Sequence, residues 1–266
     1  MKEGAVVIDN IKTNYRIAGS GPAVLVLHGW GSSYDSWKKM QNLLAKEGFF
    51  SICPDLPGFG KSQDPPPSWN LENYLNFVEK FIEKTSDIYK DFKKPFFLLG
   101  HSFGGRISIK MANRNPEKLK KLILCNAAGI KIRPGIKTML LLSIAGLGNL
   151  VFSIKPLRKV KDLFRNFFYM SLRKRDYVKA NQIMKKVMKN VLKEDLRPLL
   201  SDIKTETLIV WGKKDKIVPI ECAYIFKKEI KDAKLVILPA SHHSPHLESP
   251  EILSKKISEF LKNNEN

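Results

Sequence analysis

One serine in this chain lies in a setting that suits nucleophilic catalysis. Residues 100–104 read Gly-His-Ser-Phe-Gly, directly after the apolar run 95–99 and directly before a helical pattern that begins at Gly104. Glycines on both sides of Ser102 let two backbone segments approach closely, so a strained turn could project the Oγ atom above the end of a sheet. The pattern predicts a strand, a tight turn and a helix, with Ser102 as a nucleophile.

The other residue types that such a serine needs follow it along the chain. Asp215 comes after an apolar strand pattern, and His242, His243 and His246 come after a second strand pattern at 235–238. Open α/β sheets form their sites at the carboxyl ends of parallel strands, so we expect these side chains at one edge of a sheet. In this arrangement a histidine can take the serine proton while a carboxylate stabilises the imidazolium.

The chain resembles the α/β-hydrolase superfamily over nearly its full length. The resemblance rests on the serine turn at 100–104, a G-x-x-D-x-x-x-P loop at 212–219 and an H-x-x-H-L-E-x-P segment at 243–250. Each motif alone is moderately specific. Their occurrence together, in the order serine, aspartate, histidine, is strongly typical of the family.

The resemblance implies a catalytic role for three residues. Ser102 is expected to be the nucleophile, His243 the base, and Asp215 the carboxylate that orients His243. The family's segment usually reads Gly-His-x-x-His-x-x-x-Pro with the first histidine catalytic, which favours His243 and leaves His242 at the usual glycine position. His242 is therefore the alternative base, and His246 is expected to pack or hydrogen-bond locally.

Three other carboxylates compete with Asp215 for the acid role. Asp55 belongs to a family segment that usually shapes a turn. Glu248 lies too close to His243 along the chain to favour contact with Nδ1, and Asp195 lies in the segment inserted between the strand patterns at 121–126 and 206–211. Asp215 is the predicted acid.

The resemblance also implies an oxyanion hole. The apolar strand pattern at 23–27 ends in the segment His-Gly-Trp-Gly at 28–31, whose glycines allow the backbone to turn its amides inward. The backbone amide of Trp30 is expected to pair with that of Phe103 around the developing oxyanion. His28 is expected to support the loop rather than to act as a second base.

Alternating apolar and helical patterns predict the elements that hold these residues. Strands are predicted near 5–9, 13–18, 23–28, 49–53, 95–100, 121–126, 206–211 and 234–238, and helices over 34–47, 71–90, 104–114, 219–231 and 250–262. This alternation predicts a mostly parallel, doubly wound sheet of eight strands with an antiparallel start, and the resemblance implies that this sheet belongs to an α/β-hydrolase fold. We expect 1–129 and 199–266 to form the core and 130–198 to form a helical cap inserted into this one domain.

The predicted cap carries an apolar segment and most of the net charge. Residues 138–154 contain no charged side chain; seventeen residues interrupted by glycines are short for a membrane span, so we expect a pocket lining, with peripheral membrane contact as the alternative. Residues 131–200 contain 17 Lys and Arg against 4 Asp and Glu, a net charge of +13 out of +20. This field could attract an acidic substrate, an acidic carrier protein or anionic lipid; a lysine-rich composition with solvated helices explains it equally well.

Composition limits the other classes of function. A chain of 266 residues with 43% apolar content can bury a full core, and its first residues lack the apolar stretch of a secretory signal. Three widely spaced cysteines without a C-x-x-C pair are expected to be free thiols in a reducing cytoplasm. We predict no cofactor and no metal, because neither a metal-ligand cluster nor a dinucleotide glycine pattern is present, and no nucleic-acid partner, because no recognition motif accompanies the charge.

The sequence therefore predicts a cytoplasmic, cofactor-independent serine hydrolase, a carboxylesterase or lactonase for small to medium acyl substrates. Ser102 argues against the halide-releasing and epoxide-opening branches, which use an aspartate there. The chain also resembles carbon–carbon bond hydrolases of aromatic breakdown and, through residues 28–31, the esterases that demethylate acyl chains on carrier protein. A non-catalytic ligand receptor on the same fold is the alternative from a different class. The physiological substrate and the oligomeric state stay open.

Overall fold

The computed structural model describes residues 1–131 and 181–263 of the chain. Contacts divide the chain into two units, Met1–Ile130 together with Asn181–Asn266, and Lys131–Ala180. The apolar segment 138–154 and most of the expected cap lie outside the described residues.

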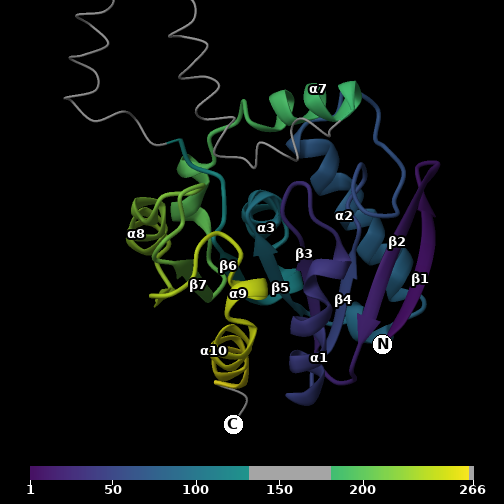
Figure 1. The fold of residues 1–266 in the computed structure, drawn as a ribbon. Coiled ribbons are helices and arrows are strands. Elements are labelled where there is room, and N and C mark those ends of the chain that lie inside the picture. Colours follow the sequence, from purple (N-terminus) through teal and green to yellow (C-terminus); the bar gives the residue numbers. More distant parts are fainter. Residues whose placement is uncertain (132–180, 264–266) are drawn as a thin grey trace, which may run out of the picture. The chain divides into compact units, whose positions relative to one another are not determined.

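The first unit is built from strands and helices that largely alternate along the chain (Figure 1). The strands are Lys2–Ile8 (β1), Ile11–Ala18 (β2), Ala23–Leu27 (β3), Phe50–Pro54 (β4), Phe96–His101 (β5), Leu119–Cys125 (β6), Thr207–Gly212 (β7) and Ala233–Leu238 (β8). The α-helices are Lys38–Lys46 (α1), Leu71–Ser86 (α2), Phe103–Arg114 (α3), Gln182–Val191 (α7), Ile220–Glu229 (α8), Pro245–Glu248 (α9) and Pro250–Lys262 (α10). Short 3₁₀ helices are Tyr34–Trp37, Lys90–Lys93, Pro116–Lys118 and Arg197–Asp202.

The strands form one eight-stranded sheet in the order β1-β2-β4-β3-β5-β6-β7-β8. Strands β1 and β2 are antiparallel to each other, β2 is antiparallel to β4, and every pair from β4 to β8 is parallel. The predicted mostly parallel sheet with an antiparallel start is confirmed. The carboxyl ends of β3, β5, β6, β7 and β8 therefore meet at one edge, which is the edge where the candidate site residues follow their strands.

Helices cover both faces of the sheet. Helices α1 and α10 pack against each other and share one apolar core with the inward side chains of the central strands. Helices α2, α3 and α8 lie on the opposite face (Figure 1). Strands β3 and β5 are buried along their whole length, as expected of parallel strands covered on both faces, and their residues are almost all apolar.

The predicted helix over 71–90 is shorter in the structure. Its start is fixed by a capping box, in which the Asn70 side chain accepts from the amide of Asn73 while the Asn73 side chain accepts from the amide of Asn70. The helix ends at Ser86, where the hydroxyls of Thr85 and Ser86 bond back to carbonyls of the preceding turn. These local bonds compete with further helical pairing.

Helix α7 falls inside the range expected for the cap, and its contacts group it with the first unit. The buried guanidinium of Arg106, on α3, donates from Nη2 to the carbonyl oxygens of Val191 at 3.0 Å and Glu194 at 2.6 Å. Burial lowers the pKa of Arg106 to about 10. A cation at the carboxyl end of α7 also suits the helix dipole. The boundaries of the cap stay a prediction.

Candidate active site

Ser102 lies at the apex of the predicted tight turn between β5 and α3. Its backbone has φ 50° and ψ −110°, a conformation that is rare for residues other than glycine and costs about 1–3 kcal/mol. A Cβ atom at Gly104 would collide with the Leu27 carbonyl oxygen, so only glycine lets α3 start this close to β3. The turn is anchored by the Gly104 amide, which donates to the His28 carbonyl oxygen at 3.1 Å.

The structure brings Ser102, His243 and Asp215 into hydrogen-bond contact. Nε2 of His243 lies 3.0 Å from the Oγ atom of Ser102, and Nδ1 of His243 lies 2.8 Å from Oδ2 of Asp215. The Asp215 side chain is inaccessible to solvent, whereas that of His243 is 16% exposed. With Asp215 ionised, the proton belongs on Nδ1 of His243, which leaves Nε2 free to accept the serine proton.

The carboxylate of Asp215 is held by four donors. Oδ2 accepts from His243 and, at 2.6 Å, from Nδ2 of Asn126, while Oδ1 accepts from the amides of Ile217 at 2.7 Å and Val218 at 3.0 Å. Burial alone would raise the pKa of Asp215, but these hydrogen bonds and the charge of His243 lower it overall. Asp215 is therefore ionised at neutral pH.

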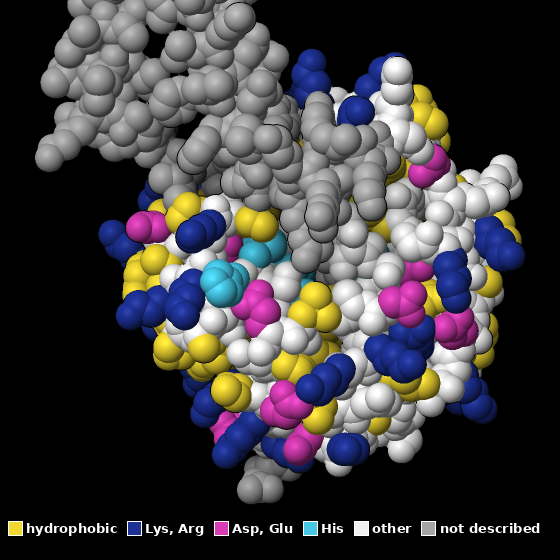
Figure 2. Space-filling model, viewed as in Figure 1, with side chains coloured by type: hydrophobic (Ala, Val, Ile, Leu, Met, Phe, Trp, Pro, Cys, Tyr) yellow, Lys and Arg dark blue, Asp and Glu magenta, His cyan; other side chains and the backbone are white. Residues whose placement is uncertain are grey.

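His242, the alternative base, bonds to Glu248, whereas His243 is the histidine that contacts Ser102. Its side chain is 57% exposed, and its Nδ1 atom lies 3.0 Å from Oε2 of Glu248. Histidine side chains and an acidic side chain form one group on the visible face of the molecule (Figure 2). His246 is buried and its ring stacks on that of Trp37, with the ring centres 4.3 Å apart.

Glu248 holds the backbone on both sides of His243. Its Oε2 atom accepts from the amide of His242 at 2.6 Å, and its Oε1 atom accepts from the amide of Ser244 at 3.2 Å. Burial would raise the pKa of Glu248, but the bonds from His242 and Ser244 lower it overall. The sequence predicted only that Glu248 is not the acid partner of His243, and its backbone contacts were not anticipated.

His101 is a further residue of the site that sequence reasoning missed. Its buried ring lies between those of His243 and His246, and Nε2 donates to the carbonyl oxygen of His243 at 2.7 Å. Burial lowers the pKa of His101 well below its ordinary range, and the charges of His246 and His243 lower it further. His101 is therefore neutral, and its position directly before the predicted nucleophile was the clue in the sequence.

The two amides predicted for the oxyanion hole belong to the loop after β3 and to the first residue of α3, and these segments lie side by side. Within the described ranges, no residue accepts a hydrogen bond from the amide of Trp30 or of Phe103. The rings of these two residues meet edge to face with their centres 5.2 Å apart, and Trp30 also meets Phe59 at 4.9 Å. The side chains thus form an aromatic wall beside the two amides.

His28 and Asp55 stabilise the loops around this wall, as the sequence predicted. The buried ring of His28 donates from Nδ1 to the Gly29 carbonyl oxygen at 2.8 Å and accepts at Nε2 from the amide of Leu56 at 2.9 Å. Burial lowers the pKa of His28 to about 4, so this ring is neutral. Asp55, also buried, accepts from the amides of Tyr34 and Lys61 at 2.7 Å each. Neither residue touches Ser102 or His243 through these bonds.

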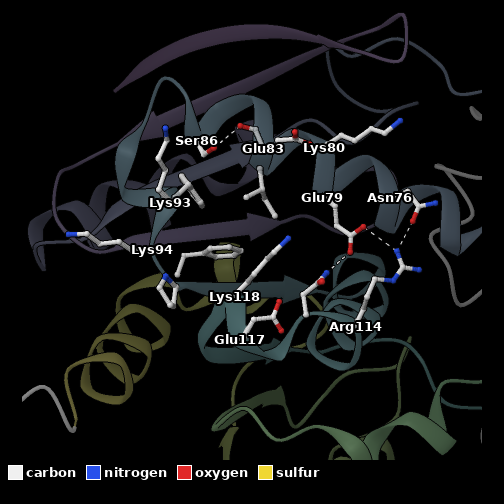
Figure 3. Close-up of a pocket in the computed structure, with 15 residues that line it drawn as sticks. Asn76, Glu79, Lys80, Glu83, Ser86, Lys93, Lys94, Arg114, Glu117 and Lys118 are labelled. Atoms are coloured by element: carbon white, nitrogen blue, oxygen red, sulfur yellow. Dashed lines mark hydrogen bonds and ion pairs between the residues drawn. The ribbon is translucent and has the colours of Figure 1, made fainter.

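A separate hollow of about 700 Å³ lies at the opposite edge of the sheet. Its apolar residues include Phe92 and Phe96, and its rim carries lysines such as Lys118. Figure 3 shows Glu79 facing Arg114, which it pairs with at 3.1 Å. Because Phe96 begins β5 and the candidate site follows the other end of that strand, the two regions are separated by roughly 20 Å of strand. None of the predicted site residues lines this hollow.

The described residues offer no group of three metal-binding side chains. All three cysteines are buried and unpaired, and burial raises the pKa of each thiol. Among the described helices, none is both long enough and apolar enough to cross a membrane.

Comparison with known proteins relates the chain to a large group of hydrolases. Residues 22–148 match the family model of the alpha/beta hydrolase fold. The chain is 30% identical to the AB hydrolase superfamily protein YisY of Bacillus subtilis, over 91% of this chain and 92% of that protein. It is also 30% identical to the pimeloyl-[acyl-carrier protein] methyl ester esterase of Wigglesworthia glossinidia brevipalpis, over 93% and 97%.

Two further comparisons involve hydrolases of other substrates. The 2-hydroxy-6-oxo-6-(2'-aminophenyl)hexa-2,4-dienoic acid hydrolase of Metapseudomonas resinovorans is 26% identical over 94% of this chain and 88% of its own. The crystal structure of a serine hydrolase involved in carbazole degradation, the CarC enzyme, superposes with a TM-score of 0.74 at 24% identity and covers 98% of both chains. The latter similarity shows the fold alone.

Proposed function

Because the chain belongs to the α/β-hydrolase superfamily, we propose that it is a serine hydrolase that cleaves carboxylic esters or lactones of small to medium acyl substrates. In this proposal Ser102 is the nucleophile, His243 the base and Asp215 the residue that orients and stabilises His243. The continuous hydrogen-bond chain from Ser102 Oγ through His243 to the buried carboxylate carries the proposal.

The first half of the proposed reaction forms an acyl-enzyme. Nε2 of His243 takes the proton of Ser102 as Oγ attacks the substrate carbonyl carbon, and the positive imidazolium is stabilised by the ionised carboxylate of Asp215. His243 then gives the proton to the leaving alcohol oxygen as the carbon–oxygen bond breaks. Water repeats the sequence on the acyl-enzyme, which releases the acid and restores Ser102.

The amides of Trp30 and Phe103 are proposed to bind the oxyanion of both tetrahedral intermediates. Both amides lack an acceptor among the described residues, which supports this role. A donor fixed in advance stabilises developing charge without reorganisation, and the loss of one such donor typically lowers kcat by a factor of about 10² to 10³.

Labelling of the serine tests the mechanism directly. A fluorophosphonate should label the wild-type protein once, at Ser102, and Ser102→Ala should lower turnover of p-nitrophenyl esters by roughly 10⁴ to 10⁶ with the fold retained. Labelling at another residue, or near-normal turnover by Ser102→Ala, would overturn the proposal. A labelled protein that turns over no ester, lactone, thioester or carbon–carbon substrate would favour the ligand-receptor alternative.

An acyl group on an acidic carrier protein is a second candidate substrate. The 30% identity to the methyl ester esterase and the net charge of +13 over residues 131–200 favour it. If this charge recruits a carrier, changing Arg173, Lys174 and Arg175 to Glu should lower kcat/KM for the carrier-bound methyl ester and leave a small neutral ester unaffected. The difference should shrink with salt, because screening acts over about 8 Å at physiological ionic strength. These three residues lie outside the described ones; an equal effect on both substrates would remove the carrier proposal.

Carbon–carbon bond cleavage is a third candidate, since one of the relatives is a hydrolase of a hexadienoic acid. A panel of p-nitrophenyl esters of increasing length, beside lactones, a thioester and a vinylogous diketone acid, would separate these reactions by kcat/KM.

We further propose that residues 130–198 form a cap that determines which of these substrates is accepted. The buried free thiols are suited to a reducing compartment, which supports a cytoplasmic enzyme. Contact of the basic region with anionic lipid is the alternative partner.

A further inference from the structure

Asn126 directly follows β6, whose neighbours in the sheet are β5 and β7. We propose that Asn126 is a positioning residue that sets the geometry between Asp215 and the segment of His243. This inference rests on the proposed function of that site. Its side chain is fully buried, and its backbone has φ 43°, a left-handed conformation that asparagine tolerates better than most residues.

Every polar atom of the Asn126 side chain is used within the site. Nδ2 donates to Oδ2 of Asp215 at 2.6 Å and to the carbonyl oxygen of His242 at 3.2 Å, and Oδ1 accepts from the amide of Gly212 at 3.2 Å. The backbone amide of Asn126 donates to the carbonyl oxygen of Val210 at 2.9 Å. Asn126 thus connects the end of β7, the proposed acid Asp215 and the backbone of His242, which directly precedes the proposed base.

Asn126 contacts the same oxygen of Asp215 that accepts from His243. Oδ2 accepts from both Asn126 and His243, so the amide fixes the rotation of the carboxyl group that His243 must meet. The bond from Asn126 to the carbonyl oxygen of His242 holds the backbone directly before His243, and so fixes the histidine that meets this carboxyl group. A small displacement of a reacting group can cost a factor of about 10² in rate, so this fixation should appear in kcat.

Asparagine is the side chain that meets these demands. It supplies two donors and one acceptor without charge, whereas leucine of similar size would leave the Gly212 amide and the His242 oxygen unpaired. Aspartate of the same shape would place a second carboxyl group against Asp215. Two carboxyl groups this close cannot both ionise easily, so they share one proton. That proton can form the hydrogen bond to Asp215 that Nδ2 of Asn126 donates in the wild type.

Two variants test the role, and one exposed residue supplies the control. Asn126→Gly removes the side chain and keeps the positive φ, and Asn126→Asp keeps the shape. Asn10 also has a positive φ, of 64°, but lies exposed in the turn between β1 and β2, so Asn10→Gly and Asn10→Asp are matched controls. kcat and KM for p-nitrophenyl acetate would be measured from pH 6 to 9, together with the thermal midpoint of each variant.

Asn126→Gly should lower kcat by about 10- to 100-fold at every pH, with KM within about threefold of the wild type. Asn126→Asp should keep much of the wild-type kcat near pH 6. Its kcat relative to the wild type should then fall at least about tenfold by pH 9, as the shared proton leaves and two carboxylates face His243. Both Asn10 variants should match the wild type throughout.

Wild-type kcat in both folded variants of Asn126 would overturn the inference, and so would an Asn126→Asp loss that does not change with pH, since a packing role alone predicts that. If Asn126→Gly does not fold, the isosteric Asn126→Asp still gives the pH readout. The proposed function fails separately, through normal turnover by Ser102→Ala. An inactive Ser102→Ala beside fully active Asn126 variants would remove only the positioning role.

Discussion

The ring of His101 donates from Nε2 to the main-chain oxygen of His243 at 2.7 Å. The residue that precedes the proposed nucleophile, Ser102, therefore holds the backbone of the proposed base, His243. This contact crosses from the end of β5 to the loop after β8, which are not neighbours in the sheet. A displacement of the histidine loop would be resisted at the serine turn itself.

This contact predicts different effects for two substitutions of His101. Glutamine can place an amide donor near the position of Nε2, so His101→Gln should keep kcat within about tenfold of the wild type. Leucine has no donor, leaves the His243 oxygen unpaired and should lower kcat by about 100-fold. Steady-state kinetics on a small ester would measure both, with thermal midpoints as the check on folding. Equal kcat in the folded leucine variant and the wild type would show that the bond has no role in catalysis.

Two adjacent histidines should differ sharply in their effect on turnover. His243→Ala should abolish ester hydrolysis, because no other imidazole lies between Ser102 and Asp215. His242→Ala should keep most of it, because His242 is exposed and bonds to Glu248. Kinetics of the two variants with one ester would decide the matter, and the reverse result would assign the base to His242.

Glu248 should contribute to catalysis through the backbone alone. Glu248→Gln keeps the size but loses the charge that attracts the amides of His242 and Ser244, so kcat should fall by about tenfold with little change in KM. Glu251→Gln is the matched control, because Glu251 pairs with Lys39 on the surface. A kcat for Glu248→Gln equal to that of the control would argue against the contribution.

Asp215 should affect both the rate and the acid stability of the fold. Asp215→Asn should lower kcat by roughly 10⁴ at neutral pH, because the imidazolium of His243 loses its stabilising charge. The pKa of Asp215 is below its ordinary value of 3.8, so ionised Asp215 adds stability that is present above that pH and is lost as the pH falls through the lowered pKa. The wild type should therefore lose stability more steeply than Asp215→Asn below about pH 4, as measured by chemical unfolding. Parallel stability curves would contradict the lowered pKa.

Local patterns in the sequence were enough to predict the sheet and to name the candidate site residues, and the resemblance to the α/β-hydrolase superfamily then favoured His243 over His242. Apolar runs marked the strands β3, β5 and β7, which are five or six residues long, and the polar residues in the segments after such strands were the candidates. The parallel order of the strands then determines that these residues share one edge. For this reason residues as distant as Ser102 and His243 could be paired before any geometry was known.

The residues that orient the site could not be found in this way. Asn126, His101 and Glu248 bond to main-chain atoms of the histidine loop. Because nearly every residue has the same main-chain groups, the residue types in that loop do not reveal such a partner. A polar residue directly after a central strand was the one available sign for Asn126.

The end of helix α2 at Ser86 was also missed. It has a local cause, because the side-chain hydroxyls of Thr85 and Ser86 bond back to carbonyl oxygens of their own turn.

The hydrogen bond between Ser102 and His243 spans 141 residues of chain. At the usual pace of synthesis, about 5–20 residues per second, His243 emerges on the order of 10 s after Ser102. Until then Ser102 has neither its proposed base nor the carbonyl oxygen that His101 binds. If Ser102 and His243 act as proposed, a nascent chain should be unreactive toward esters until His243 has emerged. The time at which Ser102 begins to react with a fluorophosphonate would therefore show when the histidine loop has folded against it.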